Sequence, residues 1–166
     1  RFQPVTEDVK RQLKMTLAQD LDLNSDDHWL LMVGSGFRTK GVDRSIRLMA
    51  HLLTKNLNVN LLIIGQDNNT QFMRMAKILK IDTQIKFLGA KENIADYMAV
   101  SSLLVHPAYR ENTGTVILES IVMGLPVVAS EVCGYATYIK ESGCGEVIPE
   151  PFTQDSFNQI VYQLLT

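Results

Sequence analysis

Two glutamates eight positions apart, Glu111 and Glu119, are the residues of this sequence whose types and spacing point most directly to chemistry. Between them lie Asn112, Thr113 and Gly114, followed by the beginning of an apolar run. If a helix begins near Gly114, its first turn offers free N–H groups and the positive end of a dipole, which together bind phosphate. Carboxylates beside such a site repel phosphate and suit hydroxyl groups instead. Phosphate and hydroxyl groups bound side by side indicate a sugar nucleotide.

A second group of candidate residues follows the first apolar run of the chain, in the segment Gly34–Gly41. Its glycines allow close backbone approach, and Arg38 and Lys40 supply positive charge for a diphosphate. Two known phosphate motifs nearly match this segment and fail. A Walker A loop places its lysine after a glycine and before Ser or Thr, whereas Lys40 precedes a glycine. A dinucleotide fingerprint needs a third glycine where this chain has Thr39. A flexible loop with solvated charges explains the segment equally well.

Glu111 and Glu119 also allow interpretations other than a sugar-nucleotide site. Spacing alone allows two solvated charges, or the acid pair of a glycosidase, although a helix between the two does not aim both at one bond. A third candidate segment, Glu131–Ala136, contains Gly134, which would let backbone amides approach a ligand; a simple tight turn explains it equally well. Cys133 in that segment is predicted to be inert, because no histidine is placed in sequence to activate it.

The elements that must position these residues are apolar runs alternating with amphipathic segments. Helical spacing of apolar residues predicts helices over Val5–Gln19, Val42–Leu53, Gln71–Leu79, Asn93–Val100, Thr115–Met123 and Thr153–Leu165. Apolar runs ended by Gly or Pro predict strands over Trp29–Val33, Val59–Ile64, Ile85–Leu88, Leu103–Val105 and Pro126–Ala129, with a sixth candidate at Glu146–Ile148. Continuous apolar strands alternating with helices predict an α/β fold with a doubly wound parallel sheet, Rossmann-like. Such sheets bind ligands at the carboxyl ends of their strands, where the candidate loops fall.

Composition narrows the class of protein further. A chain of 166 residues fits a single domain over 1–166. The net charge of −2 gives no reason to expect nucleic-acid binding, and no apolar run approaches the ~20 residues of a membrane span. The two cysteines and three histidines are scattered, which predicts no zinc site, and the absence of a secretion signal predicts a cytoplasmic protein. Because the chain begins with Arg1 and ends inside a helical pattern, we expect a fragment of a longer protein.

Three longer motifs carry a resemblance to a known family. They read Gly-Ser-x-Phe-x-x-Lys-Gly-Val-Asp-Arg-Ser-Ile from Gly34, His-Pro-Ala-Tyr-x-Glu-x-x-Gly-x-Val-x-Leu-Glu from His106, and Val-Cys-Gly-Tyr-Ala from Val132. With Gly-Gln-Asp and Gly-Leu-Pro-Val between them, they resemble the retaining GT-B glycosyltransferases of family 4, the glycosyl transferases group 1. Within that family the chain is most similar to the glucosyltransferases of the lipopolysaccharide core. The resemblance covers 29–157.

The resemblance implies specific roles for residues of this chain. Lys40 would contact the donor diphosphate, and Glu111 the hydroxyls of the transferred sugar, so these two are the expected catalytic residues. Glu119 would bind the ribose hydroxyls. The full set implied for donor binding is Gly36, Arg38, Lys40, Glu111, Asn112, Thr113, Gly114, Thr115, Val116 and Glu119, without metal or cofactor. The family has an arginine close before the lysine, whereas this chain has Thr39 there; either Arg38 reaches the phosphate from its own position or the site is weaker.

The resemblance also implies an activity. The chain would be the C-terminal, nucleotide-sugar-binding domain of a two-domain hexosyltransferase that moves glucose from UDP-glucose to a lipopolysaccharide core saccharide. The isolated domain is expected to be inactive, because an N-terminal domain would bind the lipid-linked acceptor and make any peripheral contact with the cytoplasmic face of the inner membrane. Three alternatives stay open: a non-hydrolysing sugar-nucleotide epimerase, a nicotinamide-binding domain with Asp67 on a ribose, and a non-catalytic interaction domain.

Overall fold

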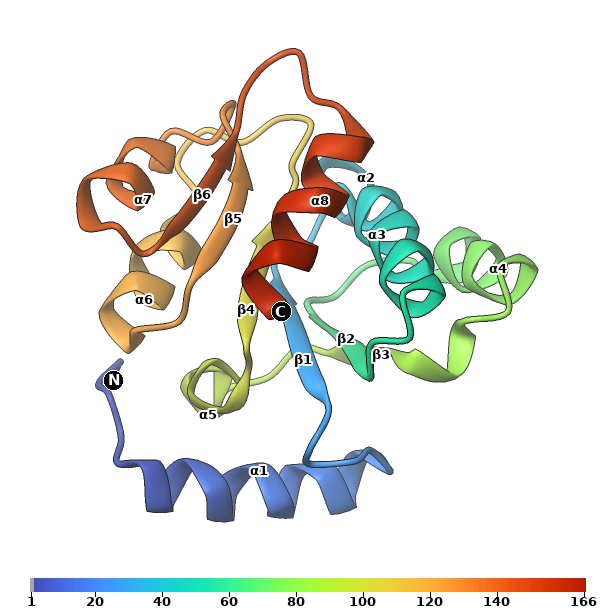
Figure 1. Ribbon diagram of the computed structural model, residues 1–166, viewed down its shortest axis with the longest axis vertical. Helices are drawn as coiled ribbons and strands as arrows, with labels where there is room; N and C mark the ends of the chain where they lie inside the picture. The colour runs from blue at the N-terminus through green and yellow to red at the C-terminus, as the bar shows by residue number, and fades with distance from the viewer. Residues whose placement is uncertain (1) are drawn as a thin grey trace.

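The computed structural model describes residues 2–166 and contains a single six-stranded sheet with helices on both faces (Figure 1). The strands are β1 (His28–Val33), β2 (Val59–Ile64), β3 (Ile85–Gly89), β4 (Leu103–His106), β5 (Val127–Ser130) and β6 (Gly145–Ile148). The helices are α1 (Glu7–Leu21), α2 (Phe37–Lys40), α3 (Val42–Thr54), α4 (Thr70–Ile78), α5 (Ile94–Val100), α6 (Thr115–Met123), α7 (Ala136–Ser142) and α8 (Gln154–Leu165). A short 3₁₀ turn, η1 (Asp82–Gln84), precedes β3. The predicted doubly wound α/β fold is therefore confirmed.

The central strands are apolar throughout because both faces of the sheet are covered. All six residues of β2 are buried, and β2 pairs in parallel with β1 from His28 opposite Val59 to Val33 opposite Ile64. Side chains alternate between two hydrophobic cores, as the pleat requires. Leu31 and other odd positions of β1 face α1, α5, α6 and α7, whereas Leu30 and the even positions face α3, α4 and α8. Figure 1 shows these two helical layers on either side of the strands.

The strand order, β3-β2-β1-β4-β5-β6, places the ligand-binding edge of the sheet. The chain builds the sheet outward from β1 in one direction, through β2 and β3, and then returns to add β4 on the other side of β1. At such a reversal the loops after the two neighbouring strands diverge and leave a crevice at the carboxyl edge. The loops after β1 and β4 are the segments that hold Lys40 and Glu111.

Two helices were not predicted from the sequence. The segment predicted as a plain loop, Gly34–Gly41, contains the single turn α2, in which Phe37 alone is buried. The seven-residue α7 follows the Glu131–Ala136 segment and buries only Ala136 and Ile139, ending at a left-handed glycine. Both helices are too short to show an apolar period, so tertiary packing decides them. Within residues 2–166, no helix is long and apolar enough to cross a membrane.

Candidate functional site

The loops after β1 and β4 are held against each other by a close backbone contact. Gly41, between α2 and α3, has a φ of +80°, and a Cβ built on it would lie 2.1 Å from the carbonyl oxygen of Pro107. A residue with a side chain would meet both backbone strain and a clash here, so glycine is required. Next to this contact, the N–H of Tyr109 donates to the carbonyl oxygen of Thr39 at 2.8 Å. The backbones of the two loops are therefore in direct contact.

Across this junction, Lys40 and Glu111 form an ion pair between Nζ and Oε2, although they lie 71 positions apart in the chain. The same carboxylate oxygen lies 3.1 Å from Nε2 of His106, the buried last residue of β4. Because a carboxylate can only accept, this contact requires the proton on Nε2. The hydrogen bond from His106, reinforced by the hydrogen bond and charge of Lys40, outweighs burial and lowers the pKa of Glu111 from 4.5 to about 2. Glu111 is therefore ionised at neutral pH.

The N-terminus of α6 completes this region. Gly114 caps the helix in the left-handed conformation, with a φ of 76°, and no side chain makes a cap hydrogen bond to the first turn. The first-turn N–H groups thus keep their capacity to bind an oxyanion. A pocket of about 200 Å³, named here the α6 pocket, is lined by Val33, Gly34, Lys40, His106, Glu111, Thr113, Gly114, Thr115, Val116 and Glu119.

The α6 pocket gathers seven of the ten residues that the resemblance implied for donor binding: Lys40, Glu111, Thr113, Gly114, Thr115, Val116 and Glu119. Gly36, Arg38 and Asn112 do not line it. Gly36 caps α2 instead, and the carbonyl of Asn112 faces the next loop. The donor-binding roles of all ten residues stay predictions. A cation, helix amides and two carboxylates in one pocket can hold phosphate and hydroxyl groups together.

The third candidate segment, Glu131–Ala136, packs against the loop that contains Glu111. A Cβ on Gly134 would lie 2.1 Å from the carbonyl oxygen of Asn112, so this glycine permits the close approach. The N–H of Tyr135 donates to the carbonyl oxygen of Thr113 at 3.0 Å, and Glu111 and Cys133 form an isolated parallel bridge. Cys133 itself is buried, and burial raises the pKa of its thiol to about 11, as expected of an inert cysteine.

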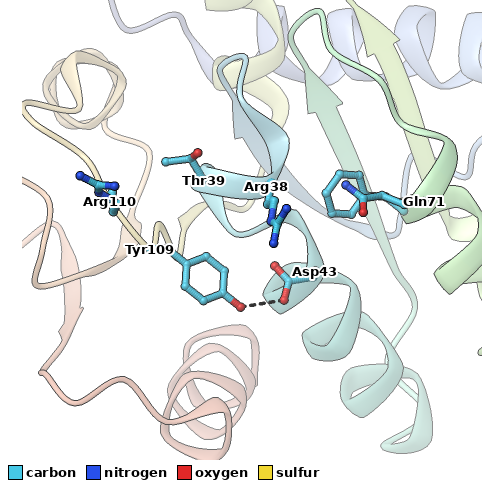
Figure 2. A pocket seen from close by; sticks show the side chains of 7 residues that line it. Arg38, Thr39, Asp43, Gln71, Tyr109 and Arg110 are labelled. Carbon is cyan, nitrogen blue, oxygen red and sulfur yellow. Dashed lines mark hydrogen bonds between the residues drawn. The ribbon is translucent and has the colours of Figure 1, made fainter.

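Two further candidate residues, Arg38 and Asp67, do not line the α6 pocket. Arg38 points into a different and larger pocket, which Figure 2 shows. Asp67, weighed as a ribose ligand, accepts a hydrogen bond from the backbone N–H of Phe37, the first residue of α2, at 2.7 Å. Within residues 2–166 no cluster of three metal-ligating side chains occurs.

His106 was not recognised from the sequence as a site residue. The signal available was its position as the last residue of an apolar run, directly before the loop of Glu111. A polar side chain at the carboxyl end of a parallel strand lies at the edge where such sheets bind ligands. Its contact with Glu111 shows that the strand end, and not only the loop, contributes to the α6 pocket.

The fold and the α6 pocket together define a GT-B-type, Rossmann-like domain with its ligand crevice beside the central strands. The chain matches the family described as "Glycosyl transferases group 1" over residues 14–166, and it belongs to that family. The lipopolysaccharide glucosyltransferase WaaG of Escherichia coli K12 is 41% identical over 145 residues, which cover 87% of this chain and 39% of WaaG.

Solved structures agree with this assignment. The crystal structure of WaaG, with 36% sequence identity, superposes with a TM-score of 0.85 over 98% of this chain and 46% of that one. Two more distant structures share the fold. Anabaena HepE, solved with UDP-glucose, gives a TM-score of 0.78 at 22% identity over 96% of this chain and 44% of HepE. The C-terminal domain of the group 1 protein LpcC from Francisella tularensis gives 0.77 at 17% identity over 99% of this chain and 85% of that domain. The chain spans less than half the length of WaaG.

Proposed function

We propose that this chain is the C-terminal, donor-binding domain of a retaining hexosyltransferase that moves glucose from UDP-glucose to a saccharide of the lipopolysaccharide core. The observation that carries the proposal is the meeting of Lys40 and Glu111, from the loops of two neighbouring strands, at the N-terminus of α6 in one pocket with Glu119. The identity to WaaG supports the glucosyl donor and the lipopolysaccharide acceptor. The UDP-glucose complex of HepE supports the kind of nucleotide.

Five residues of the α6 pocket then have a part in the reaction. Lys40 and the N–H groups of Thr115 and Val116 bind the diphosphate and offset the negative charge that develops on it as the sugar leaves. Glu111 accepts hydrogen bonds from hydroxyls of the transferred sugar, and Glu119 from those of the ribose. Because Lys40 also contacts Glu111, the cation joins the sugar-binding and phosphate-binding parts of the pocket. We expect donor binding to need no metal, because the lysine and the helix supply the positive charge.

The lowered pKa of Glu111 favours a role in binding sugar hydroxyls over that of a general acid in a glycosidase. A general acid works best with a pKa raised toward the operating pH. The pKa of Glu111 is instead lowered to about 2 by His106 and Lys40, so the carboxyl group holds no proton to donate at neutral pH. An ionised carboxylate fixed by two donors is suited to orienting hydroxyl groups.

Isothermal titration of the chain with UDP and UDP-glucose tests the proposal. We expect binding with and without EDTA, and a loss of about 10- to 100-fold in affinity for Lys40→Ala and Glu119→Ala, as is typical of hydrogen bonds to charged groups. The matched controls are Lys77→Ala and Glu141→Ala, two exposed residues near the C-terminal ends of α4 and α7, whose affinity should be unchanged. No binding of UDP at millimolar concentration, or equal affinity in all four variants, would refute the site.

The non-hydrolysing sugar-nucleotide epimerase is the second candidate, since it would share the two-domain architecture. Its product would be a free epimerised sugar nucleotide, formed without acceptor. Incubation of the full-length protein with UDP-glucose, with and without a lipopolysaccharide acceptor, separates the two activities. We expect sugar transfer only with the acceptor, and no transfer by the 166-residue chain alone. In the full-length protein we propose that the other domain binds the acceptor lipid at the cytoplasmic face of the membrane.

A further inference from the structure

A second, larger pocket contains, of the residues implied for donor binding, Arg38 alone. It has a volume of about 620 Å³ and is lined by Arg38, Thr39, Asp43, Gln71, Phe72, Tyr109 and Arg110, and it is named here the arginine pocket. These residues come from α2, the first turns of α3 and α4, and the loop after β4. Figure 2 shows Arg38, Asp43 and the Tyr109 hydroxyl near one another, with Arg110 on the other side of Tyr109. The volume falls in the range of about 300–1,000 Å³ that is usual for small-molecule sites.

The arginine pocket carries an excess of positive charge. Arg38 and Arg110 are exposed and form no ion pair with another residue of the described part of the chain. The one carboxylate of the lining, that of Asp43, is already engaged by Arg47 at 2.6 Å and by the hydroxyl of Tyr109 at 2.8 Å. The planar guanidinium group donates two parallel hydrogen bonds to a phosphate or a carboxylate. The free arginines therefore favour an oxyanion.

The arginine pocket also contains a rigid aromatic surface. The guanidinium of Arg44 lies 3.6 Å from the ring centre of Tyr109 and 3.7 Å from that of Phe152, so it is stacked between the two rings. Its Nη1 donates to the carbonyl oxygens of Pro107 and Ala108 at 3.1 and 3.2 Å. Arg44 thus covers one face of the Tyr109 ring and Asp43 accepts a hydrogen bond from its hydroxyl, yet 45% of the residue is exposed. A fixed ring suits the apolar C–H face of a sugar, because little side-chain entropy is lost on binding.

The two pockets are lined by alternating residues of the same two loops. Along the loop after β1, Arg38 lines the arginine pocket and Lys40 lines the α6 pocket; along the loop after β4, Tyr109 and Glu111 do the same. The hydrogen bond from the N–H of Tyr109 to the carbonyl oxygen of Thr39 joins these two loops. A group bound in the arginine pocket would therefore lie next to a sugar held by Glu111.

We propose that the arginine pocket binds a negatively charged saccharide, a sugar that carries a phosphate or a carboxylate, and that this sugar is part of the acceptor of the transferase. The pocket, its free arginines and its aromatic ring carry the first half of this statement. The second half rests on the proposed function, because only a transferase needs an acceptor beside its donor. Gln71, at the first turn of α4, supplies an amide for the sugar hydroxyls.

Nuclear magnetic resonance titration of the ¹⁵N-labelled chain tests the proposal with four probes: glucose 6-phosphate, glucuronate, glucose and inorganic phosphate. We expect at least one of the two charged sugars to shift the amide signals of Gln71 and Tyr109, with glucose and phosphate each binding at least tenfold more weakly. The tighter of the two charged sugars shows whether the pocket selects phosphate or carboxylate. Arg110→Gln should weaken that sugar at least tenfold, whereas Arg11→Gln, an exposed arginine on α1, should not.

Titration of the same samples with UDP separates this proposal from the proposed function. UDP should shift Thr115 and Val116 and should bind Arg110→Gln as tightly as the original chain. The proposal is overturned if neither charged sugar shifts Gln71 and Tyr109, or if inorganic phosphate binds as tightly as glucose 6-phosphate. It is equally overturned if Arg110→Gln weakens UDP as much as the sugar, since the pocket would then belong to the donor site. Failure of UDP to shift Thr115 and Val116 would instead refute the proposed function.

Discussion

Replacing Glu111 by glutamine tests how strongly the α6 pocket is held together. The Glu111 carboxylate is 11% exposed, and its pKa falls from 4.5 to about 2 because of the hydrogen bond from His106 and the contacts of Lys40. At ~1.36 kcal/mol for each pKa unit, this depression corresponds to about 3 kcal/mol of folding free energy. Lys40 is partly exposed, so solvent screening lowers the value, and we expect Glu111→Gln to cost about 2 kcal/mol at pH 7.

The pH dependence gives this prediction its sharpest form. Because the pKa is lower in the folded state, the stabilisation by Glu111 is complete above pH 4.5 and is lost as the pH falls toward 2. The difference in free energy of unfolding between the original chain and Glu111→Gln should therefore shrink to roughly half by about pH 3. Urea unfolding followed by circular dichroism at pH 7, 5, 4 and 3 measures this difference. Because both chains carry the same other carboxylates, their titration cancels in the comparison.

Glu141→Gln, an exposed glutamate on α7, serves as the control and should differ little from the original chain at any of these pH values. A Glu111→Gln chain as stable as the original at pH 7 would show that His106 and Lys40 do not stabilise the ionised carboxylate. A difference that stays constant from pH 7 to pH 3 would show that the glutamine acts by its shape and not by its lack of charge. Either result would refute the electrostatic account of the pocket.

Three further predictions concern packing and burial in the domain. Gly134→Ala places a Cβ 2.1 Å from the carbonyl oxygen of Asn112. We therefore expect the free energy of unfolding, measured with urea, to fall by about 1–3 kcal/mol, and UDP to bind more weakly. Unchanged values for both would contradict the contact. Ser45→Ala removes a buried hydroxyl that has no hydrogen-bond partner in the described residues, so stability should be unchanged or raised by up to about 1 kcal/mol, and a clear loss would reveal a missed partner. Cys133, buried and with its pKa raised to about 11, should react with a thiol reagent only on unfolding, whereas half-buried Cys144 reacts first in the folded chain; the reverse order would contradict the burial.

The sequence by itself determined the six strands and the longer helices, but not the short helices α2 and α7. The apolar runs of β1 and β2 and the amphipathic period of α3 are typical of a parallel sheet covered on both faces, and these elements lie where they were predicted. Glycines at Gly41 and Gly114 marked the helix starts, because their left-handed conformation suits few other residues. The motifs that begin at Gly34, His106 and Val132 together indicated the family without any geometry.

Only the tertiary structure decided which of these residues meet. A continuous apolar run does not specify its neighbours, so the order that sets β1 beside β4 could not be obtained from the sequence. That order joins Lys40 to Glu111 and brings in His106, a contact between side chains of distant segments. The unpredicted turn α2 aims Arg38 and Lys40 into different pockets, because residues two positions apart on a helix lie on different faces. Residue types and spacing thus specified the chemistry available, and the packing of the loops decided where each group acts.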